Sequence, residues 1–112
     1  RSPQVRSMVL DGKPATDNVT LSAGQTYDAV LDVIDHENDP LAYRWELKPE
    51  SEATQVGGAF EESISNLDGL VVASAGTARI TAPQPGEYRL FVYAYDDHGH
   101  AAHANIPFLV TP

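Results

Sequence analysis

Two short acidic stretches carry the side chains best suited to bind a cation. One spans residues 35–39, Asp-His-Glu-Asn-Asp, and the other is the Asp96-Asp97 pair. Calcium takes about six to eight oxygen ligands, which carboxylates and amides from separate loops can supply. If the fold brings the two stretches together, they predict a calcium site formed by Asp35, Glu37, Asn38, Asp39, Asp96 and Asp97. The alternative is a pair of solvated turns, because Asp and Asn also favour turns through local hydrogen bonds.

Histidines accompany both acidic stretches. His36, His98 and His100 lie within or beside them, and His103 follows a little further along. Imidazole groups next to carboxylates can bind zinc or another transition metal. The spacing follows no established zinc signature, so we expect these to be surface histidines.

A run of alternating residues, 87–95, places aromatic side chains on one face of a strand. If Tyr88, Leu90 and Val92 face the core, the opposite face carries Phe91, Tyr93 and Tyr95. Polar groups that would flank these rings are Arg44, Glu46, Arg89, His103 and Asn105. We expect the rings to pack on a neighbouring domain, since an exposed apolar patch usually marks an interface. Cover by residues 48–76 and stacking against sugar rings are the alternatives.

The remaining composition excludes several classes of function. The net charge of −9 is opposite in sign to what nucleic acid or an anionic membrane attracts. No cysteine is present, so thiol chemistry and disulfides are excluded. The sequence contains no Gly-x-Ser-x-Gly, phosphate-binding loop or His-Glu-x-x-His motif. We therefore expect no enzymatic activity.

The elements that must position these residues are short strands. Alternating or β-branched runs, separated by Gly, Pro and Asp turns, occur at residues 5–10, 27–34, 41–47, 77–82, 87–95 and 102–110, with 70–72 as a further candidate. Six or seven such strands in 112 residues predict a single all-β domain, residues 1–112. The expected architecture is an immunoglobulin-like sandwich of two antiparallel sheets, about seven strands in all, with Trp45 at the centre of the core. Pro107 predicts an edge position or a bulge in the last strand.

Two segments resemble a known family. Residues 35–45, Asp-His-Glu-Asn-Asp-Pro-Leu-Ala-Tyr-Arg-Trp, resemble a turn and strand of PKD-type and cadherin-like modules. Residues 85–90, Pro-Gly-Glu-Tyr-Arg-Leu, continuing to 96–99, resemble their penultimate strand and the turn after it. The Gly-Asp-Gly turn that commonly follows the Trp in PKD modules is replaced here by Glu-Leu-Lys-Pro at 46–49. The resemblance implies an immunoglobulin-like fold with the two acidic stretches at one end, and calcium ligands at Asp35, Asp39 and Asp96.

The resemblance also implies a setting, because such modules are attached to secreted bacterial enzymes that degrade polysaccharides or proteins. The chain starts at Arg1, and we expect it to be one module of a longer protein. The predicted function is a non-catalytic accessory or spacer domain of a secreted or cell-surface carbohydrate-active protein, with calcium stiffening one end. Its expected partner is the neighbouring domain of the parent protein. The alternatives are a carbohydrate-binding module that uses the aromatic face to hold a polysaccharide, and a calcium-dependent adhesion repeat.

Overall fold

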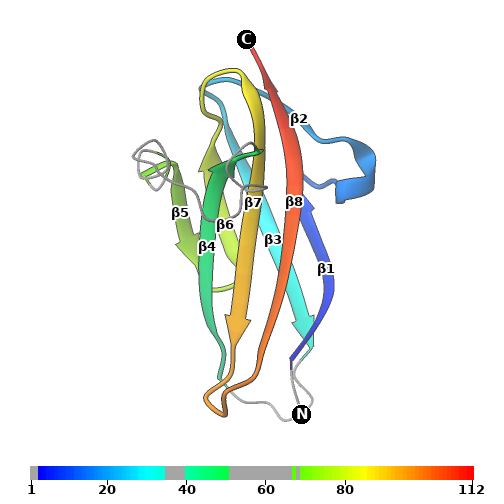
Figure 1. Ribbon diagram of the computed structural model, residues 1–112, viewed down its shortest axis with the longest axis vertical. Coiled ribbons are helices and arrows are strands. Elements are labelled where there is room, and N and C mark those ends of the chain that lie inside the picture. The colour runs from blue at the N-terminus through cyan, green and yellow to red at the C-terminus, as the bar shows by residue number, and fades with distance from the viewer. Residues whose placement is uncertain (1–2, 35–39, 51–66, 68) are drawn as a thin grey trace.

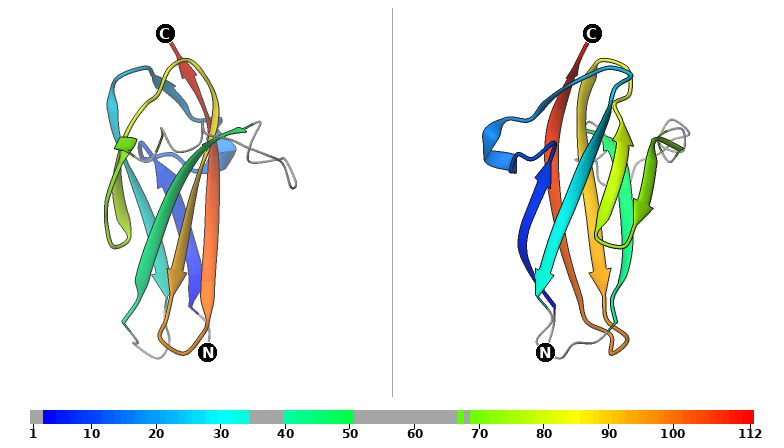
Figure 2. Two further views of the ribbon diagram at one scale, coloured as in Figure 1. Left: turned by 60° about the vertical axis from the view of Figure 1, so that its left-hand side comes forward. Right: turned by 180° about the vertical axis from the view of Figure 1, so that it is seen from behind.

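The protein is a sandwich of two four-stranded sheets (Figures 1 and 2). The computed structural model describes residues 3–34, 40–50, 67 and 69–112. The strands are β1 (Gln4–Leu10), β2 (Thr20–Ser22), β3 (Thr26–Ile34), β4 (Ala42–Pro49), β5 (Val71–Ser74), β6 (Thr77–Thr81), β7 (Gly86–Tyr95) and β8 (Ala101–Thr111). A 3-10 turn, η1 (Ala15–Asp17), lies between β1 and β2. None of the described residues belongs to a helix long and apolar enough to cross a membrane.

The sheet topology is that of the immunoglobulin fold. The first sheet has the order β1-β3-β6-β5 and the second the order β2-β8-β7-β4. Numbered along the chain, β1-β3-β6-β5 and β8-β7-β4 correspond to the two sheets of a constant-type immunoglobulin domain. The prediction of an all-β immunoglobulin-like sandwich is therefore confirmed.

The expectation of purely antiparallel sheets is wrong at one place. β2 pairs in parallel with the end of β8, with Thr20 opposite Leu109 and Ser22 opposite Thr111. This strand was not predicted, because three residues are too short to show an alternating pattern. The pairing covers the outer edge of β8 at its carboxyl end and brings η1 next to the second sheet.

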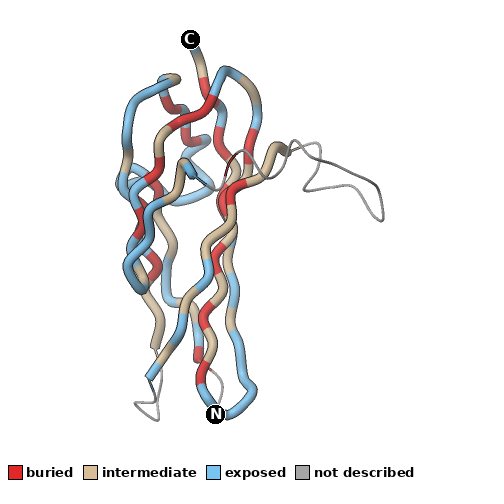
Figure 3. Tube along the Cα trace, turned by 90° about the vertical axis from the view of Figure 1, so that its left-hand side faces the viewer, coloured by how far each residue is buried: buried red, intermediate tan, exposed pale blue. Residues whose placement is uncertain are grey.

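The core lies between the two sheets and follows the predicted alternation. Along β7, residues Tyr88, Leu90, Val92 and Ala94 are buried, and each is followed by a partly exposed neighbour (Figure 3). Residues Ile106, Phe108 and Val110 of β8 lie beside them, and Leu10, Leu47 and Ile80 enter from other strands. Burying one face and solvating the other is what a sheet of a sandwich requires, so the alternation alone determines which residues form the core.

Trp45 does not occupy the centre of the core, contrary to the prediction. Its side chain is half-buried and packs against the edge of both hydrophobic clusters. β4 is an edge strand, so an inward side chain on it reaches the open side of the sandwich, where β5 and β6 are joined. There the Trp45 indole Nε1 donates a 2.9 Å hydrogen bond to the carbonyl oxygen of Ala75. Trp45 thus links the rims of the two sheets, while fully buried aliphatic residues such as Leu90 and Ile106 form the centre.

Tyr88 supplies a fold-specific hydrogen bond at the start of β7. Its hydroxyl donates to the carbonyl oxygen of Gln84, four residues earlier, at 2.7 Å. A tyrosine near the start of this strand that binds the preceding backbone is the tyrosine corner of immunoglobulin-like domains. Burial raises the pKa of this hydroxyl, so it stays a donor. The bond fixes the connection that crosses from β6 to β7.

The position of Pro107 follows from the edge of β8. Leu109, two residues later, donates its N–H outward to Val19 at 3.0 Å, so the nitrogen of Pro107 points to the same side. β2 begins opposite Leu109, two residues after Pro107 in β8. The missing N–H therefore removes no ladder hydrogen bond. β8 lies between β2 and β7, so the predicted edge position holds for the part of β8 before Leu109 and not for the whole strand.

Candidate functional site

The aromatic residues of β7 lie on the outer face of the second sheet, as the alternation predicted. Phe91, Tyr93 and Tyr95 are each half-buried and point away from the core. The register places these rings in the middle of three rungs, between β4 and β8. The rungs are Ala42–Tyr95–Ala101, Arg44–Tyr93–His103 and Glu46–Phe91–Asn105. We call these nine residues the aromatic face.

Basic side chains from β4 lie over two of the three rings. The Arg44 guanidinium carbon is 4.8 Å from the centroid of the Tyr93 ring, and the Lys48 ammonium nitrogen is 5.8 Å from that of Phe91. Both are cation–π distances. Glu46 lies between the two cations, with a carboxylate oxygen 3.4 Å from Arg44 Nε and another 3.8 Å from Lys48 Nζ. These two ion pairs of Glu46 keep the Arg44 and Lys48 side chains over the rings.

Tyr93 is the centre of the aromatic face. Its ring lies 6.4 Å from that of Tyr95 with an angle of 9° between the planes, and 6.2 Å from the His103 ring at 41°. With Arg44 above it, Tyr93 therefore contacts groups from β4, β7 and β8. Arg44, Tyr93, Tyr95 and His103 were all predicted as site residues, and the structure brings them together.

Arg89, also predicted for this site, lies at the margin of the aromatic face nearest the start of β7, which we call its upper margin. Its Nε and Nη2 donate to the two carboxylate oxygens of Glu50 at 3.0 and 2.9 Å, and its Nη1 donates to Asn105 Oδ1 at 2.6 Å. The side-chain hydrogen bond to Glu50 raises the pKa of Arg89 further above its usual value. The Arg89 and Glu50 side chains are both partly buried, and a bidentate pair of this kind is among the stronger polar contacts in proteins.

Lys48 and Glu50 were not predicted as site residues. The predicted strand ended at residue 47, whereas β4 continues to Pro49. Extending the alternation by one rung places Lys48 on the same face as Arg44 and Glu46, which is the signal that could have identified it. Glu50 lies just beyond the strand, so no periodicity indicated its contact with Arg89.

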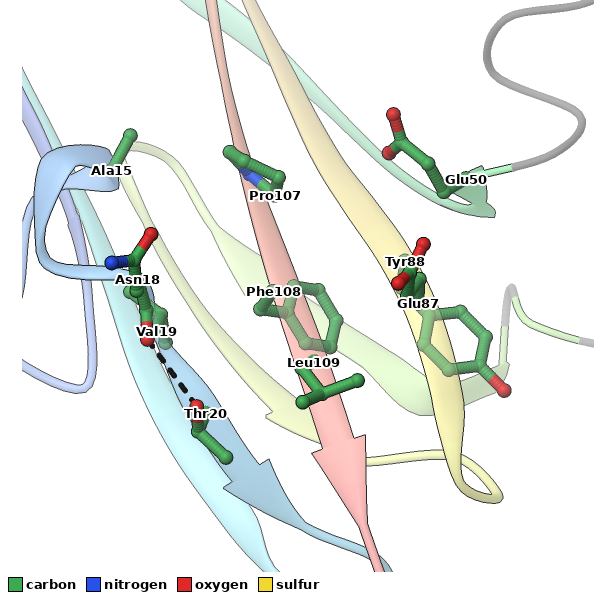
Figure 4. Close-up of a pocket in the computed structure, with 10 residues that line it drawn as sticks. All are labelled: Ala15, Asn18, Val19, Thr20, Glu50, Glu87, Tyr88, Pro107, Phe108 and Leu109. Atoms are coloured by element: carbon green, nitrogen blue, oxygen red, sulfur yellow. Dashed lines mark hydrogen bonds between the residues drawn. The ribbon is translucent and has the colours of Figure 1, made fainter.

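A shallow groove adjoins the aromatic face at its upper margin (Figure 4). It has a volume of about 390 Å³ and crosses β8. Pro107 and Leu109 form its floor, the η1–β2 segment bounds one side, and Glu50 and Glu87 bound the other. Sequence reasoning missed this groove because it depends on the parallel β2–β8 pairing.

The charges on this surface differ from those of the whole chain. Among the described residues, three cations (Arg44, Lys48, Arg89) and three carboxylates (Glu46, Glu50, Glu87) belong to the aromatic face and its margin. Their formal charges cancel, although the chain carries −9 overall. The surface is therefore aromatic and locally neutral on a strongly acidic molecule.

The second predicted site is at the opposite end of β7, where Asp96 begins the turn to β8. Its side chain has no exposed surface. Asp96 Oδ1 accepts hydrogen bonds from the backbone N–H groups of His98 and His100, both at 2.9 Å, and Oδ2 lies 3.1 Å from His100 Nδ1. Asp97 next to it is exposed and lies 3.3 Å from His98 Nδ1.

The hydrogen bonds determine the charge of Asp96. Burial is the largest single influence and raises its pKa. Hydrogen bonds act in the opposite direction: they come from the backbone N–H groups of His100 and His98 and from the His100 side chain. Together they outweigh burial and lower the pKa of Asp96 to about 2. Asp96 is thus ionised at neutral pH, and its oxygens organise the turn.

The other predicted calcium ligands, Asp35, Glu37, Asn38 and Asp39, lie outside the described residues, as does His36. The end of β3 and the start of β4 lie at the end of the sandwich that also holds the β7–β8 turn (Figure 1), and Pro40 lines a hollow with Asp96 and Asp97. Within the part of the chain that the structure describes, no three His, Asp or Glu side chains are grouped as a metal site would require. A calcium site at this end remains a prediction.

Comparison of the chain with known protein families and with curated proteins finds no match. The functional argument therefore depends on the geometry of the aromatic face, its margin and the turn at Asp96.

Proposed function

We propose that this domain is a non-catalytic accessory module that docks on a neighbouring protein domain through the aromatic face. One observation carries the proposal. Phe91, Tyr93 and Tyr95 keep exposed surface on the outside of the second sheet, while the hydrophobic core is filled by the opposite side chains of the same strand. Since the core is packed without these rings, folding alone gives no reason for three aromatic residues in succession on this face.

The composition of the aromatic face is that of a protein interface. Tyrosine, phenylalanine and arginine are enriched at such interfaces, and the residues that dominate binding are most often Trp, Tyr or Arg. The central rung of Arg44, Tyr93 and His103 has this character. The ion pairs around it hold the long side chains in place, which lowers the conformational entropy lost on binding.

The local neutrality of the surface supports docking further. A chain with a net charge of −9 repels most acidic proteins, and the repulsion is weakest where the local charges cancel. The described residues of the aromatic face have both properties: their formal charges cancel, and their rings offer apolar surface. Within the nine residues of the aromatic face, Arg44 and Glu46 pair with each other, so a partner that covers this face encloses no unpaired carboxylate there.

Sugar binding is the second candidate, favoured by the arrangement of Tyr93 and Tyr95. Two rings with an angle of 9° between their planes resemble the aromatic platforms on which sugar rings stack. The Arg44 guanidinium over Tyr93 argues the other way, because it occupies one face of the central ring. We therefore place protein docking first.

The wider setting comes from the family resemblance. PKD-type and cadherin-like modules accompany secreted bacterial enzymes, which supports a role as a spacer or docking domain of a secreted or cell-surface protein that acts on polysaccharides. In that role the aromatic face fixes the angle between this domain and its neighbour. Calcium bound near Asp96 and Asp97 would stiffen the other end.

Hydroxyl-radical footprinting tests the docking. The oxidation rates of Phe91, Tyr93 and Tyr95 are compared between the isolated domain and the full-length parent protein, with Tyr27 on the other sheet as the internal control. We expect at least fivefold protection of Tyr93 in the parent protein and no change at Tyr27. Equal rates in both forms would overturn the proposal.

One variant, Tyr93→Ala, separates protein docking from sugar binding. Tyr93→Ala should release the domain from its neighbour and remove the protection of Phe91 and Tyr95, while migration in gels containing soluble polysaccharides stays unchanged. Retarded migration of the wild-type domain, abolished by Tyr93→Ala, would show sugar binding instead.

A further inference from the structure

The groove next to the aromatic face has an apolar floor. Pro107 and Leu109 of β8 form it, and Leu109 is 41% exposed. Among the described residues only two other large hydrophobic side chains, Val30 and Val72, are as exposed, and both lie on the other sheet. An exposed leucine beside a proline in a concave surface is a site where a partner can bury apolar area.

The two carboxylates on one side of the groove differ in their surroundings. Glu50 is held by Arg89 through two hydrogen bonds of 3.0 and 2.9 Å. Glu87 is exposed, and none of the described residues forms a hydrogen bond or an ion pair with it. Figure 4 shows both side chains on the same side of β8, opposite Ala15 and Asn18. The groove therefore combines an apolar floor with one carboxylate available for a cation.

We propose that this groove receives a basic side chain, arginine or lysine, from the protein that docks on the aromatic face. The long methylene stem of such a side chain lies on apolar surface while its charged head stays polar. Here the stem would cover Pro107 and Leu109, and the head would reach Glu87. A carboxylate from the partner would be repelled, and a purely apolar group would leave Glu87 partly desolvated without a partner.

The groove and the aromatic face form one continuous surface. In the β7–β8 register Pro107 lies opposite Arg89, one rung from the Asn105–Phe91 pair of the aromatic face. A partner that covers the rings therefore extends naturally to the groove, and the net charge of −9 favours the approach of a basic partner. This inference rests on the proposed function, because it assumes that the occupant of the aromatic face is a protein.

Titration of the ¹⁵N-labelled chain with N-acetyl-arginine methylamide, followed by NMR, tests the groove directly. The control ligand is the citrulline analogue, which has the same shape without the charge. We expect the largest amide shift changes at Thr20, Glu87 and Leu109, and a two- to fivefold weaker affinity for citrulline, the range of an exposed ion pair. Glu87→Gln should reduce the arginine affinity to the citrulline level, whereas Asp32→Asn, on the other sheet, should leave it unchanged.

Three results would overturn the proposal: equal affinity for the two ligands, shift changes spread evenly over the acidic surface, or no effect of Glu87→Gln in a folded variant. Each is independent of the footprinting of Tyr93. If Tyr93 is protected in the parent protein but arginine does not bind, only the proposal for the groove is rejected. If arginine binds but Tyr93 is not protected, docking through the aromatic face is rejected.

Discussion

At the scale of single residues, Asp96 shows how a side chain that suggests a metal ligand can serve the backbone. The sequence shows an acidic pair in a turn, which is compatible with both roles. Whether the carboxylate faces solvent or the N–H groups two and four residues later depends on the path of the turn, and this is set by Gly99 with φ of 85° and by the start of β8. No periodicity in the sequence encodes that path.

The lowered pKa of Asp96 predicts how stability depends on pH. The pKa falls from about 3.8 in the unfolded chain to about 2 in the folded one, so the ionised carboxylate stabilises the fold fully above the unfolded value. This contribution is lost as the pH falls from about 4 through about 2. In urea unfolding between pH 7 and 2, the wild-type midpoint should fall more steeply over this window than that of Asp96→Asn, which should already be lower at pH 7.

The exposed neighbour supplies the control. Asp97→Asn should follow the wild-type curve closely, because a surface pair such as Asp97–His98 contributes little. Parallel curves for wild type and Asp96→Asn would show that the hydrogen bonds in the turn do not stabilise the charged form.

At the scale of the strands, the sequence was most informative where the period of two runs longest. β7 has ten residues, and its inward and outward faces were predicted correctly. β2 was missed because it has three residues. Trp45 was placed on the correct face but too deep, because the alternation gives the face of a strand and not its place in the sheet. The aromatic face could be predicted for the same reason as the core, whereas the groove needed a pairing between strands about ninety residues apart.

A matched pair of leucines tests the assignment of faces. Leu90 of β7 has no exposed surface and Leu109 of β8 is 41% exposed. Leu90→Ala should lower the free energy of unfolding by about 3 kcal/mol, since it removes buried methyl groups and leaves a cavity. Leu109→Ala should lower it by less than about 1 kcal/mol. Equal losses in chemical denaturation would contradict the described register.

At the scale of the whole molecule, charge is the dominant feature. A net charge of −9 on 112 residues produces repulsion that the compact state feels more than the unfolded chain. Raising sodium chloride from about 0.01 to 0.5 M shortens the Debye length from about 30 Å to under 5 Å and screens this repulsion. The thermal midpoint should rise by at least about 2 °C.

The effect of salt should be general rather than specific to the cation. Sodium and potassium chloride should give the same rise, and EDTA should not alter it. A midpoint that is unchanged or falls with salt would show that the ion pairs on the second sheet outweigh the overall repulsion.

The placement of the first and last strands determines how the domain responds to a mechanical force. The start of β1 and the end of β8 lie at opposite ends of a molecule whose longest dimension is 44 Å (Figure 1). Tension applied through β1 and β8 pulls β8 along its own axis, past β2, which is connected to β1 through η1. The hydrogen bonds between β2 and β8 are then loaded together in shear rather than opened one at a time. In a chain of such modules, the force at which a domain unfolds would depend on how fast the short parallel β2–β8 pairing breaks.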